Sequence, residues 1–176
     1  MSSNTSIDLN EFIRAIPDFP KPGILFRDIT PLLSHPPAFR QVVDMLCERY
    51  AEKSIDTIVA AEARGFIFGA PMAVKMGVPF VPIRKPGKLP YQSMRHEYDL
   101  EYGTDTLEMH IDAISEGHRV LVVDDLLATG GTVNACCTMV EKAGGEVVDC
   151  AFIIELEALG GREKLAPRPC YSLLKY

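Results

Sequence analysis

The sequence predicts an α/β fold, a single domain with a doubly wound, mainly parallel sheet and helices on both faces. Short apolar runs typical of buried strands alternate along the chain with amphipathic stretches typical of helices. The 176 residues match the size of one compact domain. With 47% hydrophobic and 24% charged residues, the composition excludes collagen-like and wholly disordered chains. We therefore expect one domain over residues 1–176.

The N-terminal part combines one predicted helix with an irregular segment. Residues 8–16 carry apolar side chains at helical spacing, with Asp8 as the N-cap and Glu11 three positions later. Pro17 ends this pattern, and two further prolines keep the chain irregular. Because three apolar residues still follow at positions 24–26, we interpret residues 18–30 as a structured loop that covers another part of the molecule.

From residue 36 onward, helices and strands alternate. Pro36 and Pro37 suit the first turn of a helix whose apolar stripe extends to Tyr50. Strands are predicted at 55–60, 78–83, 107–111, 120–123 and 147–154, and helices at 65–76 and 132–143. Gly77 and Gly144 end these two helices. Such alternation favours a parallel sheet between two layers of helices.

Residues 84–103 interrupt this alternation. The segment has glycine and proline breaks and no sustained period, and it exceeds the length of ordinary connections. Between positions 84 and 96 it carries four basic and no acidic side chains, on a chain with a net charge of −6. We expect a long mobile lid loop over an anionic ligand, with a merely solvated loop as the alternative.

Charge, cysteine spacing and the N-terminal residues exclude several classes of protein. The net charge of −6 disfavours a nucleic-acid-binding protein. The chain begins without the basic and apolar regions of a signal peptide, and charged residues interrupt its most apolar stretch. Five cysteines without CxxC spacing indicate neither a disulfide framework nor a zinc ribbon. We expect a cytoplasmic protein with reduced thiols and with neither nucleic acid nor membrane as a partner.

Residues 120–132 carry the strongest chemical motif. An apolar strand is followed by two acids, a turn of small residues and a helix. The N–H groups of Thr129, Gly130, Gly131 and Thr132 would lie at the positive end of the helix dipole, where a phosphate binds. The turn lacks the lysine of a Walker A loop and the GxGxxG of a dinucleotide-binding loop. We therefore predict a phosphate site of another kind.

The two acids upstream of this turn predict a sugar site. Asp124 and Asp125 follow the predicted strand at 120–123. Carboxylates in this place can accept hydrogen bonds from the vicinal hydroxyls of a phosphorylated sugar, or from waters on a divalent ion. The alternative is that one of the two acids only caps the following turn.

A second turn, at residues 60–66, has similar features. It follows a predicted strand and opens a helix, and its small residues leave backbone donors accessible. Arg64 can bind an anion through two parallel hydrogen bonds, although a local ion pair with Glu62 is the alternative. Together with the basic lid, the two turns indicate a substrate with separated phosphate groups.

Several motifs resemble a known family. Val-Val-Asp-Asp-Leu-Leu-Ala-Thr-Gly-Gly-Thr at 122–132 resembles the 5-phosphoribosyl 1-diphosphate motif of type I phosphoribosyltransferases. Further matches at 18–31, 62–66, 84–90, 100–103 and 161–166 narrow the resemblance to the adenine phosphoribosyltransferase family, over nearly the whole chain. The resemblance implies the type I fold, with an N-terminal hood at about 17–34 and a lid loop at about 84–103.

The resemblance also implies an activity. Phosphoribose would pass from 5-phosphoribosyl 1-diphosphate to N9 of adenine and give AMP and diphosphate, in purine salvage, with Mg²⁺ and usually in a homodimer. Two alternatives stay open: a phosphoribosyltransferase for another base, and a non-catalytic regulator that senses phosphoribosyl diphosphate. The negative charge and the lack of an added helix-turn-helix count against the regulator.

Carried over position by position, the resemblance implies roles for individual residues. The 5′-phosphate would be held by Ala128, Thr129, Gly130, Gly131 and Thr132, and the ribose hydroxyls by Asp124 and Asp125. Diphosphate would be held by Ala63, Arg64, Lys85 and Lys88, and adenine by Leu25, Phe26, Arg27 and Leu159. Glu101 would be the catalytic acid near N7, with Tyr102 in the closed lid. Mg²⁺ would be held mainly by the substrate, with a water-mediated contact to Asp124 or Asp125 left open. No role is assigned to Tyr91, Arg95 or His96.

Overall fold

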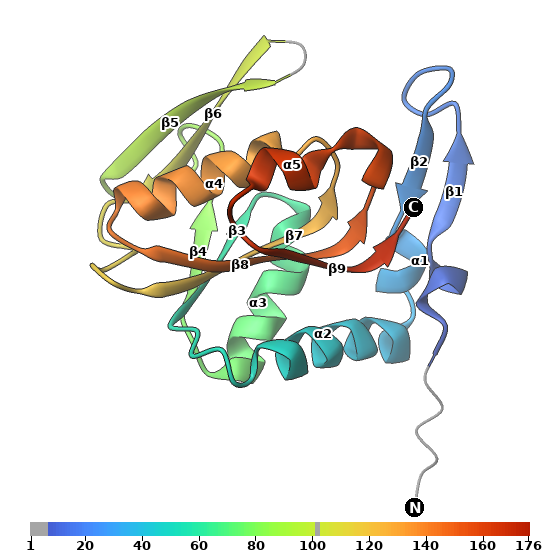
Figure 1. Ribbon diagram of the computed structural model, residues 1–176, viewed down its shortest axis with the longest axis horizontal. Helices are drawn as coiled ribbons and strands as arrows, with labels where there is room; N and C mark the ends of the chain where they lie inside the picture. The colour runs from blue at the N-terminus through green and yellow to red at the C-terminus, as the bar shows by residue number, and fades with distance from the viewer. Residues whose placement is uncertain (1–6, 101–102) are drawn as a thin grey trace, which may run out of the picture. The chain divides into compact units, whose positions relative to one another are not determined.

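The computed structural model describes residues 7–100 and 103–176 (Figure 1). The chain forms two compact units, Met1–Met45 and Leu46–Tyr176, and each is described by itself. The single domain expected over residues 1–176 stays a prediction.

The first unit is built around a small antiparallel sheet. A 3₁₀ helix, η1 (Leu9–Phe12), precedes strand β1 (Arg14–Pro17), which pairs with β2 (Leu25–Asp28). The short helix α1 (Thr30–Leu33) and the start of α2 (Pro36–Tyr50) follow. The long helix predicted at 8–16 is therefore wrong. Asp8 does cap the chain, since its Oδ1 accepts from the Asn10 N–H at 2.9 Å, but only one turn forms because β1 pairs with β2 instead.

The second unit contains a parallel sheet of five strands in the order β4-β3-β7-β8-β9. Its strands are β3 (Thr57–Ala61), β4 (Phe80–Ile83), β7 (Arg119–Leu127), β8 (Glu146–Glu155) and β9 (Cys170–Lys175). Its helices are α3 (Arg64–Met76), α4 (Gly131–Lys142), the 3₁₀ turn η2 (Glu157–Leu159) and α5 (Gly161–Leu165). Figure 1 shows α3 on one face of the sheet and α4 and α5 on the other. The predicted doubly wound α/β fold is confirmed.

The interior of the second unit is mainly apolar. Every residue of β3 is buried, as is most of β7 and β8, which explains why these strands are near-continuous apolar runs in the sequence. Cys136 and Cys137 of α4 are buried, free thiols that pack as small apolar side chains.

Among the described helices, none has the length and apolar character needed to cross a membrane.

The direction of winding reverses between β3 and β7. The chain passes from β3 outward to β4 on one side, and from β7 through β8 to β9 on the other. β3 and β7 are parallel neighbours, with Ala60 opposite Val123, and β7 continues beyond this pair to Leu127. The turns that follow these two strands therefore lie at the same edge of the sheet. Ligands of doubly wound sheets bind outside the carboxyl ends of the strands at such a reversal.

In the second unit, a separate two-stranded sheet replaces part of the predicted lid loop. Strands β5 (Ser93–Leu100) and β6 (Gly103–His110) pair in antiparallel orientation, so the loop expected at 84–103 is wrong for residues 93–100 and for residue 103. Met94 and Tyr98 share one face of β5 and pack against the buried cluster under α4. Polar residues lie between and around Met94 and Tyr98, so this strand shows no clear apolar alternation in the sequence. Arg84 also exchanges two backbone hydrogen bonds with Glu108, at 2.9 and 2.7 Å.

A buried carboxylate ties the C-terminal elements together. The side chain of Glu155 is 5% exposed and accepts hydrogen bonds from Arg162 Nη2 at 2.6 Å and Ser172 Oγ at 2.8 Å. Arg162 also donates to the Cys170 carbonyl at 2.8 Å. The hydrogen bond from Arg162 is the main cause that lowers the pKa of Glu155. Arg162 thus joins α5 to the ends of β8 and β9.

We predict that Arg162→Met lowers the free energy of unfolding at pH 7 by about 1–3 kcal/mol, because Glu155 loses charged hydrogen bonds while it stays buried. The lowered pKa means that the carboxylate stabilises the fold above the ordinary glutamate pKa, and that this stabilisation is lost as the pH falls through the lowered value. Urea unfolding at neutral and acidic pH should show the difference between wild type and variant narrowing in acid.

The matched control is Lys175→Met, which removes an ion pair with Glu157 whose side chains are 50% and 56% exposed. Its effect should stay below about 1 kcal/mol at pH 7. Equal stability of wild type and Arg162→Met at pH 7 would contradict the assigned role.

Candidate active site

The turn between β7 and α4 presents unpaired N–H groups at a helix N-terminus. Gly130 adopts a left-handed conformation (φ 80°) directly before α4, and no side chain caps the helix. Within the described residues, the N–H groups of residues 129–133 donate no hydrogen bond to the protein. The positive end of the helix dipole adds to these donors. These N–H groups are the donors that a phosphate would accept from, and the phosphate-binding role of the turn stays a prediction.

A second glycine turn supports this anion-binding turn. A Cβ atom at Gly161 would collide with the Ala128 carbonyl oxygen and would lie 2.8 Å from Leu127 Cδ1. A Cβ atom at Gly130 would in turn lie 2.8 Å from the Gly161 carbonyl oxygen. The two backbones approach more closely than any side chain allows, so the start of α5 fixes the path of the chain through residues 128–130.

The two acids lie within β7 rather than after it, because the strand continues to Leu127. Asp124 Oδ1 accepts from the Asp125 N–H at 2.9 Å, and Asp125 Oδ2 lies 2.6 Å from Arg64 Nε. Loss of solvation, with the adjacent Asp125 carboxylate, raises the pKa of Asp124, and burial raises the pKa of Asp125. In the described part of the chain, neither carboxylate accepts from the turn at 128–133, so the capping alternative gains no support.

The turn between β3 and α3 packs beside the acids. A Cβ atom at Gly65 would lie 2.9 Å from the Val123 carbonyl oxygen and 3.1 Å from Asp124 Oδ1, so only glycine allows this approach of α3 to β7. Ala63 and Arg64 are exposed, and the peptide bond between Glu62 and Ala63 is cis. The alternative ion pair between Glu62 and Arg64 does not form: Glu62 Oε2 accepts from Arg84 Nε at 2.6 Å, while Arg64 pairs with Asp125.

Basic side chains follow β4. The Lys85 ammonium forms an ion pair with Asp105 of β6. Lys88 is exposed, its carbonyl accepts from Arg84 Nη1 at 3.3 Å, and within the described chain its ammonium has no partner. Of the two lysines predicted to bind diphosphate, one is therefore held by an acid of β6 and the other faces solvent.

Sequence reasoning missed two polar residues of β5 and β6. The Tyr98 hydroxyl of β5 lies 3.3 Å from Thr132 Oγ1 at the start of α4 and 3.4 Å from Asp105 Oδ2. Neither residue belongs to a recognisable motif. The available signal was alternation: Tyr98 follows Met94 at an even spacing, and Asp105 precedes Leu107 and Met109 at even spacings.

The structure describes the four residues predicted to bind adenine but not the predicted catalytic acid. Leu25, Phe26 and Arg27 lie on β2 of the first unit, where the Phe26 ring meets Phe19 edge-on at 5.1 Å. Leu159 ends η2 of the second unit and is 48% exposed. Glu101 and Tyr102 lie outside the described residues. These six roles stay predictions.

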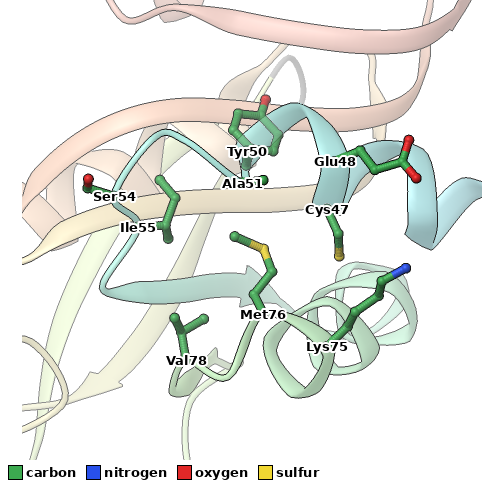
Figure 2. Close-up of a pocket in the computed structure, with 9 residues that line it drawn as sticks. All are labelled: Cys47, Glu48, Tyr50, Ala51, Ser54, Ile55, Lys75, Met76 and Val78. Atoms are coloured by element: carbon green, nitrogen blue, oxygen red, sulfur yellow. The ribbon is translucent and has the colours of Figure 1, made fainter.

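A pocket of about 420 Å³ lies at the opposite edge of the sheet (Figure 2). Ile55 and Val78, which line it, precede β3 and β4, so the pocket lies at the amino ends of these strands. The other lining residues are Cys47, Glu48, Tyr50, Ala51, Ser54, Lys75 and Met76. None of the predicted site residues contributes to it, so it is separate from the anion-binding turns.

Comparisons with known proteins agree with this geometry. Residues 28–173 match the phosphoribosyl transferase domain family. Adenine phosphoribosyltransferase of Roseiflexus sp. is 57% identical over 96% of this chain and 98% of its own length. The crystal structure of adenine phosphoribosyltransferase from Thermoanaerobacter pseudethanolicus has a TM-score of 0.92 and 53% identity, over 96% of this chain and 98% of that one. The enzyme of Saccharomyces cerevisiae, solved with an imino-altritol bisphosphate and adenine, has a TM-score of 0.88 and 40% identity over 94% and 96% of the two chains.

The match to the domain family spans most of the chain, and the relatives are covered almost completely. The resemblance read from the motifs is therefore confirmed: the chain belongs to the adenine phosphoribosyltransferase family, the pentosyl-transferring enzymes that form AMP.

Proposed function

We propose that this protein transfers 5-phosphoribose from 5-phosphoribosyl 1-diphosphate to adenine, giving AMP and diphosphate in purine salvage. The observation that carries the proposal is the set of unpaired N–H groups at residues 129–133, beside Asp124, Asp125 and Arg64. This arrangement offers donors for a phosphate, acceptors for sugar hydroxyls and a cation for a second phosphate group. The membership of the chain in the family supports the base and the reaction.

The residues act on the two ends of the substrate. The turn at Ala128, Thr129, Gly130, Gly131 and Thr132 binds the 5′-phosphate, and Asp124 and Asp125 bind the ribose hydroxyls. Arg64 then exchanges its bond to Asp125 for diphosphate, where the backbone of Ala63 and the ammonium groups of Lys85 and Lys88 join it. Negative charge builds on diphosphate as its bond to the sugar breaks, so these cations stabilise the transition state.

The remaining predicted residues act on the base. Leu25, Phe26, Arg27 and Leu159 contact adenine, with the Phe26 ring stacking on the base. Glu101 holds a hydrogen bond at N7 and makes N9 a better nucleophile. Tyr102 belongs to the segment that excludes water from the cationic sugar. These roles rest on the sequence motifs.

Mg²⁺ fits the site as a partner of the substrate. Among the described residues no group of three or more His, Cys, Asp or Glu side chains could hold a metal ion. The carboxylate oxygens of Asp124 and Asp125 can accept hydrogen bonds from sugar hydroxyls or from metal-bound waters. When bound through the diphosphate oxygens, the ion neutralises leaving-group charge. A homodimer and a cytoplasmic location stay predictions.

The activity itself is tested by supplying adenine, hypoxanthine or guanine with 5-phosphoribosyl 1-diphosphate and Mg²⁺ and measuring nucleotide formation. We expect AMP to form, with kcat/KM for adenine at least about 100-fold above that for the other bases. Equal rates for the three bases would contradict the assignment of Leu25, Phe26 and Arg27. Substrate binding without turnover would favour the regulator.

The anion-binding turn is tested by Gly161→Ala. The added Cβ meets the Ala128 carbonyl and displaces the turn, so we expect KM for 5-phosphoribosyl 1-diphosphate to rise by about 10-fold or more. Gly160→Ala is the matched control, because Gly160 has φ 64° but no backbone within 4 Å of its Cβ position. This control should lower the melting temperature through backbone strain and leave KM near the wild-type value. An unchanged KM in Gly161→Ala would contradict the supporting role of the glycine turn.

Glu101 is tested by Glu101→Gln. Loss of the carboxylate at N7 should lower the single-turnover rate of AMP formation by about 10²–10⁴-fold, with a much smaller change in the affinity for adenine. Glu97→Gln, in the same segment of the chain, is the control and should keep the wild-type rate. A wild-type single-turnover rate in Glu101→Gln would return Glu101 to the role of a solvated acid.

A further inference from the structure

The loop after β4 carries the two lysines that are proposed to bind diphosphate. It begins at Arg84, whose backbone exchanges hydrogen bonds with the backbone of Glu108 in β6 at 2.9 and 2.7 Å. Three positions later, the Gly87 N–H donates to Glu108 Oε2 at 3.0 Å. One residue of β6 therefore holds the loop at two points, with Lys85 between these contacts and Lys88 directly after them.

The side chain of Glu108 is almost completely buried. It is 2% exposed, and its Oε1 accepts from Nε of Arg95, whose own side chain is 69% exposed, at 2.5 Å. Burial of a carboxylate is costly, so an apolar side chain of the same size would pack here at lower cost. Gly87 adopts a left-handed conformation (φ 75°), so the chain turns sharply at the residue that the carboxylate holds. The hydrogen bond to this turn gives the buried carboxylate a purpose that packing does not.

The loop is also joined to the turn between β3 and α3. Arg84 Nε donates to Glu62 Oε2 at 2.6 Å, and Arg84 Nη1 donates to the Lys88 carbonyl oxygen at 3.3 Å. The Glu62 N–H in turn donates to the Ile83 carbonyl oxygen at 2.9 Å. The two segments that carry the proposed diphosphate ligands therefore share one hydrogen-bonded frame, and Glu108 is its buried anchor.

We propose that Glu108 is a positioning residue for diphosphate. Its carboxylate acts through the loop and fixes the backbone from which Lys85 and Lys88 extend. The inference rests on the proposed function and adds to it a residue outside the recognised motifs. Within the described residues, the hydrogen bonds of Glu108 reach the loop after β4 and β5 but not the turn between β7 and α4. Glu108 should therefore affect one end of the substrate and not the other.

The experiment measures two dissociation constants by calorimetry in the full-length protein, that of pyrophosphate with Mg²⁺ and that of ribose 5-phosphate. Glu108→Met replaces the carboxylate with an apolar side chain of similar length, so the Gly87 N–H loses its acceptor. We expect the dissociation constant of pyrophosphate to rise about 10-fold or more, because the loop loses its fixed position. The dissociation constant of ribose 5-phosphate should stay at the wild-type value.

Two further variants separate positioning from a general loss of stability. Glu108→Gln keeps an amide oxygen that can accept from the Gly87 N–H, so it should restore most of the affinity for pyrophosphate. Arg95→Met is the matched control, because it removes the ion pair with Glu108 and leaves the hydrogen bond to Gly87. It should lower the melting temperature, since a buried carboxylate loses its cation, and leave both dissociation constants unchanged.

Glu108→Asp keeps the test decisive if the methionine variant does not fold. It preserves the charge, but its side chain is one methylene shorter and withdraws from the Gly87 N–H, so we expect the same selective loss of pyrophosphate affinity.

Wild-type affinity for pyrophosphate in folded Glu108→Met or Glu108→Asp, or an equal loss for both ligands, would overturn the inference while the proposed function stands. Failure of Glu108→Gln to restore pyrophosphate affinity would overturn it as well. If the wild-type protein bound neither ligand and formed no AMP, the proposed function would fail and the inference with it.

Discussion

The unpaired N–H groups at the start of α4 are the constraint on which the rest of the second unit depends. Helix α4 begins without a capping side chain, so within the described part of the protein its first N–H groups have no acceptor. The surrounding structure keeps this acceptor site open. Gly130 and Gly161 let two backbones meet closely, and β7 holds the turn at the reversal of the sheet, where β3 delivers a second turn. In the proposed function, a phosphate is the acceptor for these N–H groups.

Much of this arrangement could be predicted from the sequence because its signals are local. Apolar runs identified β3, β7 and β8, since strands buried on both faces need no polar alternation. Glycines marked the end of α3 and the turn before α4, where the backbone adopts a left-handed conformation. The anion-binding turn followed from the order of strand, small residues and helix. The two acids were expected after the strand, but β7 continues past them to Leu127, and their role in binding the sugar stays a prediction.

The remaining parts depend on contacts between distant segments, which leave weak local signals. The β5–β6 sheet was missed because β5 is half polar and is stabilised by pairing with β6 and by packing under α4. The pairing of β1 with β2 likewise overrode helical spacing at residues 13–16. Asp105 could not be assigned because its importance comes from Lys85, twenty positions earlier in the chain. The roles of Leu25, Phe26, Arg27, Leu159, Glu101 and Tyr102 came from resemblance alone and await the experiments given for them.

The strand order has a geometric consequence for the ligand. Two neighbouring parallel strands are separated by about 4.8 Å, and this spacing is set by backbone hydrogen bonds that no side chain replaces. The pairing of β3 with β7 ends at Ala60 and Val123, and β7 continues to Leu127, so the register of the two strands fixes how far apart their following turns begin. Substitutions around the turns can change the affinity of each turn for a charged group. They leave this offset unchanged, because it is fixed by the register of two buried strands.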